Sequence, residues 1–188
     1  AQSTYAKMVE IFNGSYEEIY EHYRLATQND GNEVASLVML FVFLNKIILS
    51  DNVAQVPEQN APLPKEYDAP LVLNLPYLQT LNRLIHEEML KRLTEKSSPL
   101  RIAISLRYAA TCLVNGDPAC INTAPYILEW ANKVVETNPK FPELSLIYTI
   151  RAKTYFYLAD LEKALENIDL AIKQAPHEYY YYAEKADL

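Results

Sequence analysis

The chain has 188 residues, enough to bury a hydrophobic core without disulfide or metal cross-links. Its formal charge of −7 argues against a non-specific nucleic-acid binder, because such proteins need basic surfaces to displace counterions. Only three glycines occur, so a glycine-rich loop that binds phosphate is not expected.

The first 56 residues are predicted to form a helical hairpin, which we take as an N-terminal domain (1–56). Ser15 and Glu18 make a capping box, and large side chains follow at helical spacing (Tyr16, Ile19, Tyr20 and Tyr23). A second helix is predicted from Glu33 to Ser50, apolar on most sides and therefore buried. Its apolar run falls short of the roughly 20 residues that span a bilayer, so no membrane span is expected.

A proline-rich connector follows at 57–76. Prolines at five positions prevent a continuous helix there (Pro57, Pro62, Pro64, Pro70 and Pro76). Long segments without regular structure are uncommon inside compact domains. We therefore predict a domain boundary in this connector.

Helix signals resume at Tyr77 and continue to the end of the chain. Ser98-Pro99 is a typical helix start, Asp160 is a typical N-cap, and Pro139 and Pro176 end helices. The predicted helices span 77–93, 99–113, 123–138, 142–158 and 160–175, and a last one begins near Glu178. The fold class predicted for the whole chain is all-α, built from antiparallel helical hairpins.

One set of residues repeats at specific intervals within 142–176. The intervals are 4, 3, 9, 4, 3 and 5 residues, and the positions are Tyr148, Ala152, Tyr155, Ala164, Ile168, Ala171 and Pro176. Two antiparallel helices pack closely where small residues cross, and the alanines supply such residues. Large side chains between them fill the remaining space. We predict that these positions form the packing surface of a helix pair.

This spacing resembles the tetratricopeptide repeat, a helix–turn–helix unit of about 34 residues. Tyr182 and Ala186 fall in phase, 34 residues after Tyr148 and Ala152. The resemblance is clear over 145–188 and degenerate over 99–141. It implies a right-handed α-solenoid in the C-terminal half, within a repeat region at 77–188. The alternative is an unrelated helical bundle.

The resemblance also implies where a partner binds. In such repeats the first helices line a concave groove that takes peptides or protein segments. The groove positions of the matched unit are Leu146, Thr149, Ile150, Lys153, Phe156 and Tyr157. Thr149, Lys153, Phe156 and Tyr157 are the predicted partner-binding residues, with Lys153 available to a carboxylate and the two aromatic rings to apolar groups.

The two cysteines bear on the compartment. Cys112 and Cys120 flank an Asn-Gly-Asp-Pro turn, so a disulfide is sterically possible, and two small buried side chains are the alternative. A disulfide would favour an oxidising compartment. We therefore expect a periplasmic or secreted location, with the cytoplasm as the alternative.

No catalytic constellation is visible, and we expect no enzyme activity, cofactor or metal. Glu18 and His22 share a helix face, but such pairs are usually solvated polar residues. His86-Glu87-Glu88 lacks the second histidine of a zinc-protease helix.

Tyrosine is unusually frequent, with 15 residues, and 179–182 is a run of four. Tyrosine is enriched at protein interfaces, so this run indicates a contact surface for a partner or for a further repeat. We expect a non-catalytic protein–protein interaction scaffold or assembly subunit. One alternative is a structural subunit of a larger envelope filament or sheath, with self-assembly or co-assembly. Another is a small-ligand-binding or enzymatic helical domain.

Overall fold

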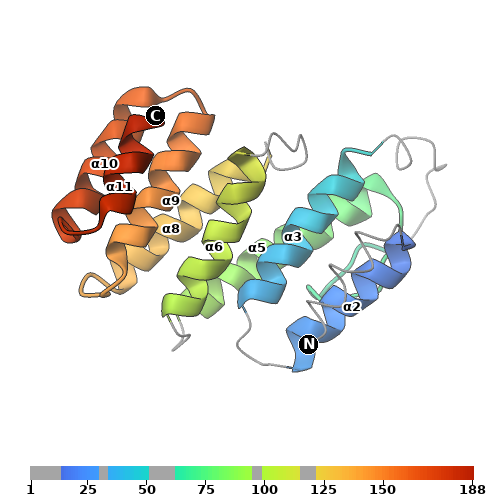
Figure 1. Cartoon of the computed structure of the whole chain (residues 1–188). Helices are drawn as coiled ribbons and strands as arrows, with labels where there is room; N and C mark the ends of the chain where they lie inside the picture. The colour runs from blue at the N-terminus through green and yellow to red at the C-terminus, as the bar shows by residue number, and fades with distance from the viewer. Residues whose placement is uncertain (1–13, 30–33, 51–61, 95–98, 115–121) are drawn as a thin grey trace. The chain divides into compact units, whose positions relative to one another are not determined.

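A computed structural model of the chain describes residues 14–29, 34–50, 62–94, 99–114 and 122–188 (Figure 1). Within these ranges the chain forms eight helices and no strand, which confirms the all-α class. The chain divides into two compact units, residues 1–92 and 93–188.

The first unit is centred on α3 (Val34–Ile48), most of whose fifteen residues are buried. It packs against α2 (Tyr16–Asn29), which begins at the predicted cap: the Glu18 N–H donates to Ser15 Oγ at 3.2 Å. Ile19, Tyr20 and Tyr23 are buried, and the Tyr23 ring lies 5.7 Å from that of Phe43. The predicted cap and the predicted burial of α3 are therefore confirmed.

The segment 62–74, which belongs to the predicted connector, is bonded to the helices of the first unit. The Tyr20 hydroxyl on α2 donates to the Ala69 carbonyl, and the Tyr77 hydroxyl donates to the Pro70 carbonyl at 2.7 Å. Arg24 reaches the Asp68 carbonyl at 3.5 Å. Side chains thus supply donors to a stretch of main chain that has no helical hydrogen bonds of its own.

The helix α5 (Leu75–Thr94) follows this segment directly. Asn74 caps it, because its Oδ1 accepts the Tyr77 N–H at 3.1 Å. Asn82 on α5 donates to Asn45 on α3 at 2.9 Å, in the interior of the unit. Since the units divide at Arg92, α5 up to that residue lies in the first unit, whereas the predicted domain ranges assign it to the repeat region.

The second unit holds five helices within its described residues. They are α6 (Pro99–Val114), α8 (Ala124–Thr137), α9 (Leu144–Tyr157), α10 (Leu161–Gln174) and α11 (Tyr179–Ala186). The helix α9 packs against α6, α8 and α10, and α10 also packs against α11 (Figure 1). Asp160 caps α10 by accepting the Lys163 N–H at 3.2 Å, as predicted for an N-cap.

Small side chains line the contact between α9 and α10. Ala152, Ala164 and Ala171 are buried, and Ile168 is buried with them. Of the other predicted packing residues, Tyr148 and Tyr155 are partly buried and Pro176 is exposed after the end of α10.

The two positions on α11 that follow Tyr148 and Ala152 by 34 residues are not buried as the repeat predicts. Tyr182 and Ala186 are exposed, and the neighbouring Tyr181 is buried in their place. The side chain that α11 inserts into the second unit is therefore displaced by one residue from the position that the 34-residue period predicts.

Candidate protein-binding surface

A charged and aromatic group links α6, α9 and α11. Lys153 Nζ on α9 lies 2.7 Å from Glu184 Oε1 on α11 and 5.9 Å from the centroid of the Tyr180 ring. The Arg107 guanidinium on α6 lies 5.6 Å from the same ring centroid. One tyrosine ring on α11 is therefore contacted by cations from two other helices, an attraction that the ring quadrupole provides.

Partial burial strengthens this group. The side chains of Lys153 and Glu184 are 28% and 17% exposed, so solvent screens their attraction less than it screens a fully exposed pair. Burial raises the pKa of the Tyr180 phenol, and its hydrogen bond with Glu184 raises it further, while the two cations act in the opposite direction. The phenol therefore stays protonated at neutral pH.

Exposed apolar side chains flank the group. Phe156 lies three residues after Lys153 and Ile104 three residues before Arg107, so each shares a helix face with its cation. Phe156 is 44% exposed and Ile104 is 57% exposed. We call the set of six residues the first-helix surface: Ile104, Arg107, Lys153, Phe156, Tyr180 and Glu184.

The structure gives the four predicted partner-binding residues different environments. Phe156 is exposed and Tyr157 is partly buried. Lys153 is partly exposed and already paired within the chain. Thr149 is buried, and its hydroxyl donates to the Ser145 carbonyl at 2.9 Å. Phe156 thus offers the largest free surface of the four.

Four members of this surface were not among the predicted partner-binding residues: Ile104, Arg107, Tyr180 and Glu184. Tyr180 lies 34 residues after Leu146, a predicted groove position, so extending the period would identify it. Arg107 carries no such signal, because the repeat pattern is degenerate around it. Its place beside Tyr180 depends on how α6 and α11 are arranged around α9.

A buried contact anchors α11 beside this surface. The Tyr181 ring packs with Ala152, Ile168 and Ala171, and its hydroxyl lies 2.9 Å from Ser145 Oγ. The hydroxyl therefore has a hydrogen-bond partner inside the unit, which a buried polar group requires. We call these four partners of Tyr181 the tyrosine site.

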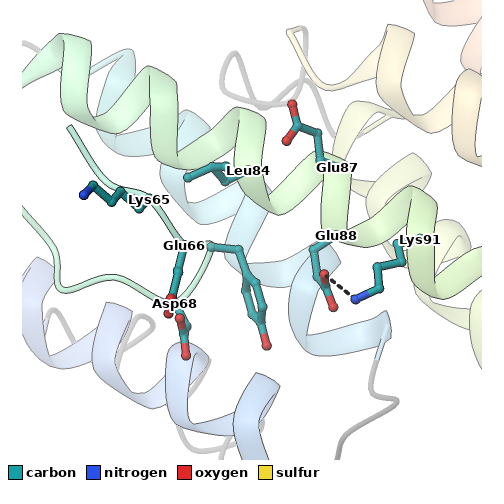
Figure 2. Close-up of a pocket in the computed structure, with 8 residues that line it drawn as sticks. Lys65, Glu66, Asp68, Leu84, Glu87, Glu88 and Lys91 are labelled. Atoms are coloured by element: carbon teal, nitrogen blue, oxygen red, sulfur yellow. Dashed lines mark ion pairs between the residues drawn. The ribbon is translucent and has the colours of Figure 1, made fainter.

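The first unit contains a separate open pocket of about 400 Å³. Figure 2 shows its labelled lining, with Lys65, Glu66 and Asp68 from the segment 62–74 and Leu84, Glu87, Glu88 and Lys91 from α5. Tyr67 completes the lining.

Ion pairs and hydrogen bonds within the chain hold most of the carboxylates of this pocket. Glu88 lies 2.8 Å from Arg92 and 3.8 Å from Lys91, the pair drawn as a dashed line in Figure 2. Glu87 pairs with Arg83, and Asp68 accepts a hydrogen bond from Gln28 at 2.6 Å. Contacts within the chain therefore engage Asp68, Glu87 and Glu88 of this lining.

Several expectations concern residues that the structure does not describe. The side chain of Cys112 and the whole of Cys120 lie outside the described residues, so neither the sterically possible disulfide nor its alternative, two buried thiols, is placed. Among the residues that are described, no group of three or more His, Cys, Asp or Glu side chains is arranged to hold a metal ion. None of the described helices is long and apolar enough to cross a membrane.

Comparisons with protein-family models, with curated proteins and with solved structures give no significant match for this chain.

Proposed function

We propose that this chain is a non-catalytic protein–protein interaction scaffold or assembly subunit, which binds a protein segment through the first-helix surface. The proposal includes a right-handed tetratricopeptide-like arrangement of the helices in the second unit. The observation that carries it is the combination, on α6, α9 and α11, of exposed apolar side chains with a partly buried group of charges.

The chemistry of this surface suits a protein segment. Aromatic and arginine side chains are the types most enriched in protein interfaces, and Phe156, Tyr180 and Arg107 supply them here. An apolar side chain of the partner would cover Phe156 and Ile104. A partner carboxylate would interact with Arg107 and compete with Glu184 for Lys153.

The surface is supported by a compact base. Buried alanines allow α9 and α10 to pack closely, and α9 also contacts α6 and α8. A binding surface on packed helices needs little ordering when a partner binds, which lowers the entropic cost of association.

The test is capture of a partner from native extract, followed by mass spectrometry, with matched variants. We expect Phe156→Ala and Lys153→Ala to lose proteins that the unchanged chain retains. Leu170→Ala and Lys173→Ala are the controls, because both side chains are exposed on α10 and lie outside the first-helix surface. Equal capture by all four variants would show that the partner does not use this surface.

A second candidate is a structural subunit that packs into a larger assembly. It is favoured by exposed leucines that are not members of the first-helix surface, Leu158, Leu161 and Leu170. Such a subunit should self-associate over a broad surface. Sedimentation of the purified chain over a range of concentrations separates the two candidates. A protein that binds a partner segment stays monomeric, whereas a structural subunit forms larger species, and these persist in the variant Phe156→Ala.

We further propose a periplasmic or secreted location, with the cytoplasm as the alternative. The proposal depends on whether Cys112 and Cys120 form the disulfide that their spacing allows. A free-thiol assay on protein isolated from its native source tests it directly. Two free thiols would remove the main support for an oxidising compartment. The absence of free thiols would strengthen the proposal.

A further inference from the structure

We infer that the surface of α9 and α10 beneath α11 is a receptor for a short helix that presents a tyrosine and, three residues later, a glutamate. In this view α11 is an occupant of the receptor that a partner helix of the same pattern displaces. The inference rests on the proposed function, because it names the chemistry of a partner helix that would take the place of Tyr180 and Glu184, the two residues that α11 contributes to the first-helix surface.

The first element of recognition is the tyrosine site. Ala152 and Ala171 have small side chains, which leave room for the Tyr181 ring next to Ile168. Ser145 Oγ at 2.9 Å pairs with the hydroxyl. A phenylalanine would leave Ser145 without this partner inside the protein, and an unpaired buried polar group is costly. The site is therefore selective for tyrosine.

The second element is a charge at a defined distance from the tyrosine. Glu184 follows Tyr181 by three residues, so both side chains project from one face of α11. That face places the Glu184 carboxylate 2.7 Å from Lys153 Nζ. The adjacent Tyr180 adds ring contacts to Lys153 and Arg107. A helix with lysine in place of the glutamate would meet a like charge instead.

The third element is the small buried surface of α11. Tyr181 is its buried residue, and its charged contacts are the ion pairs of Glu184 with Lys153 and of Lys185 with Asp169, while Tyr179 is 88% exposed. Segments that bury few side chains open at a lower free energy than the core does. The receptor is therefore accessible to a competitor in a minor population of molecules.

A short connection keeps α11 close to its receptor. Only residues 175–178 separate it from the end of α10, so α11 rebinds at a high effective concentration. A free helix of equal affinity competes poorly until this intramolecular contact is weakened. Removing the contact raises the fraction of open receptors, and the apparent affinity for a free helix rises by the same factor.

The experiment uses the full chain and a fluorescently labelled synthetic peptide with the sequence of residues 176–188. Binding is followed by fluorescence anisotropy. In the chain variant Glu184→Lys, the new lysine repels Lys153 and frees the receptor, so we expect the unchanged peptide to bind about tenfold more tightly, or better, than it binds the original chain. Glu166→Lys is the control, because it makes the same charge change at an exposed residue of α10 that is not part of the tyrosine site.

A charge exchange makes the test specific. The chain variant Lys153→Glu should bind a peptide that carries Glu184→Lys and reject the unchanged peptide, whereas the chain variant Glu184→Lys should show the opposite preference. A peptide that carries Tyr181→Phe should bind more weakly than the unchanged peptide. Hydrogen exchange of residues 179–186 in both chain variants reports whether α11 has opened.

Two results would overturn the inference. One is an opened α11 with no saturable peptide binding, and the other is unchanged protection of 179–186 in both charge variants. The proposed function is tested separately through Phe156. If Phe156-dependent partner capture persists while the peptide preferences fail, this inference alone is rejected. If the peptide preferences hold while capture ignores Phe156, the proposed function is rejected.

Discussion

The helix α3 of the first unit and the helix α10 of the second differ in how much of their surface is buried. In the first unit, α3 is buried on most sides, and hydrogen bonds from Tyr20 and Tyr77 attach the segment 62–74 to the helices. In the second unit, α10 buries one face through Ala164, Ile168 and Ala171 and exposes the other. A helix enclosed on most sides adds stability and leaves little surface for a partner. A helix buried on one side leaves the other side available for binding.

The largest effect should come from the core of the first unit. Phe41 is fully buried on α3, and Phe41→Ala removes a large side chain and leaves a cavity. We expect the first unit to lose about 3–5 kcal/mol of its free energy of unfolding. Hydrogen exchange of residues 34–48 with increasing urea measures the loss. Phe156→Ala, the same change at an exposed position, should have a far smaller effect; similar losses for both would contradict the enclosed packing of α3.

A smaller loss is expected from the alanine contact of the second unit. Ala164 is fully buried on α10, which packs against α9, and Ala164→Leu adds volume to this packed interior. We expect a loss of about 1–3 kcal/mol from overpacking. The chain has one tryptophan, Trp130, and it is buried on α8, so its fluorescence reports unfolding of the second unit. Ala186→Leu on the exposed side of α11 is the control, and equal midpoints for both variants would refute close packing at Ala164.

The smallest loss should come from the attachment of the non-helical segment. Tyr20→Phe removes the donor to the Ala69 carbonyl and keeps the ring. We expect the first unit to lose about 1 kcal/mol, the usual net contribution of one hydrogen bond. Urea unfolding monitored by hydrogen exchange in α2 measures it. Tyr179→Phe, at a highly exposed ring, should leave the stability unchanged. If Tyr20→Phe also leaves it unchanged, the hydrogen bond to Ala69 does not stabilise the attachment of the segment.

Tyr20 should also make the stability of the first unit depend on pH. Burial raises the pKa of the Tyr20 phenol above its ordinary value of 10.0, and burial also raises that of Tyr77. The folded first unit therefore keeps protons that the unfolded chain releases. Its stability from this source is complete below about pH 10 and falls as the pH rises above that value. We expect Tyr20→Phe to lose less stability than the unchanged chain between about pH 10 and about pH 12.

Local signals in the sequence were sufficient to place the helices. Ser15 and Asp160 cap α2 and α10 because a short polar side chain reaches the main-chain N–H three residues ahead, within a single turn. Asn74 caps α5 in the same way, but the prolines around it led us to assign it to the connector. Prolines mark where helix cannot form, and they carry no information on whether a segment is packed.

The candidate surface was only partly predictable. The repeat spacing pointed to Lys153 and Phe156, which both belong to the first-helix surface. It also pointed to Thr149, which is buried and bonded to the Ser145 carbonyl. Arg107 and Glu184 lie far from Lys153 in the sequence, and no local pattern connects them. Their contacts depend on how the helices pack.

The amino-acid sequence was enough to establish an all-helical chain, most helix ends and the small residues available for close packing, because these features depend on neighbours within a few positions. The three-dimensional structure was needed to show that 62–74 binds to α2, that Glu184 pairs with Lys153, and that Tyr181 rather than Tyr182 is buried. Glu184 lies 31 positions after Lys153, and Ala69 lies 49 positions after Tyr20 on α2. Their formation depends on which face each helix turns toward its neighbours, and a shift of one residue rotates that face by about 100°.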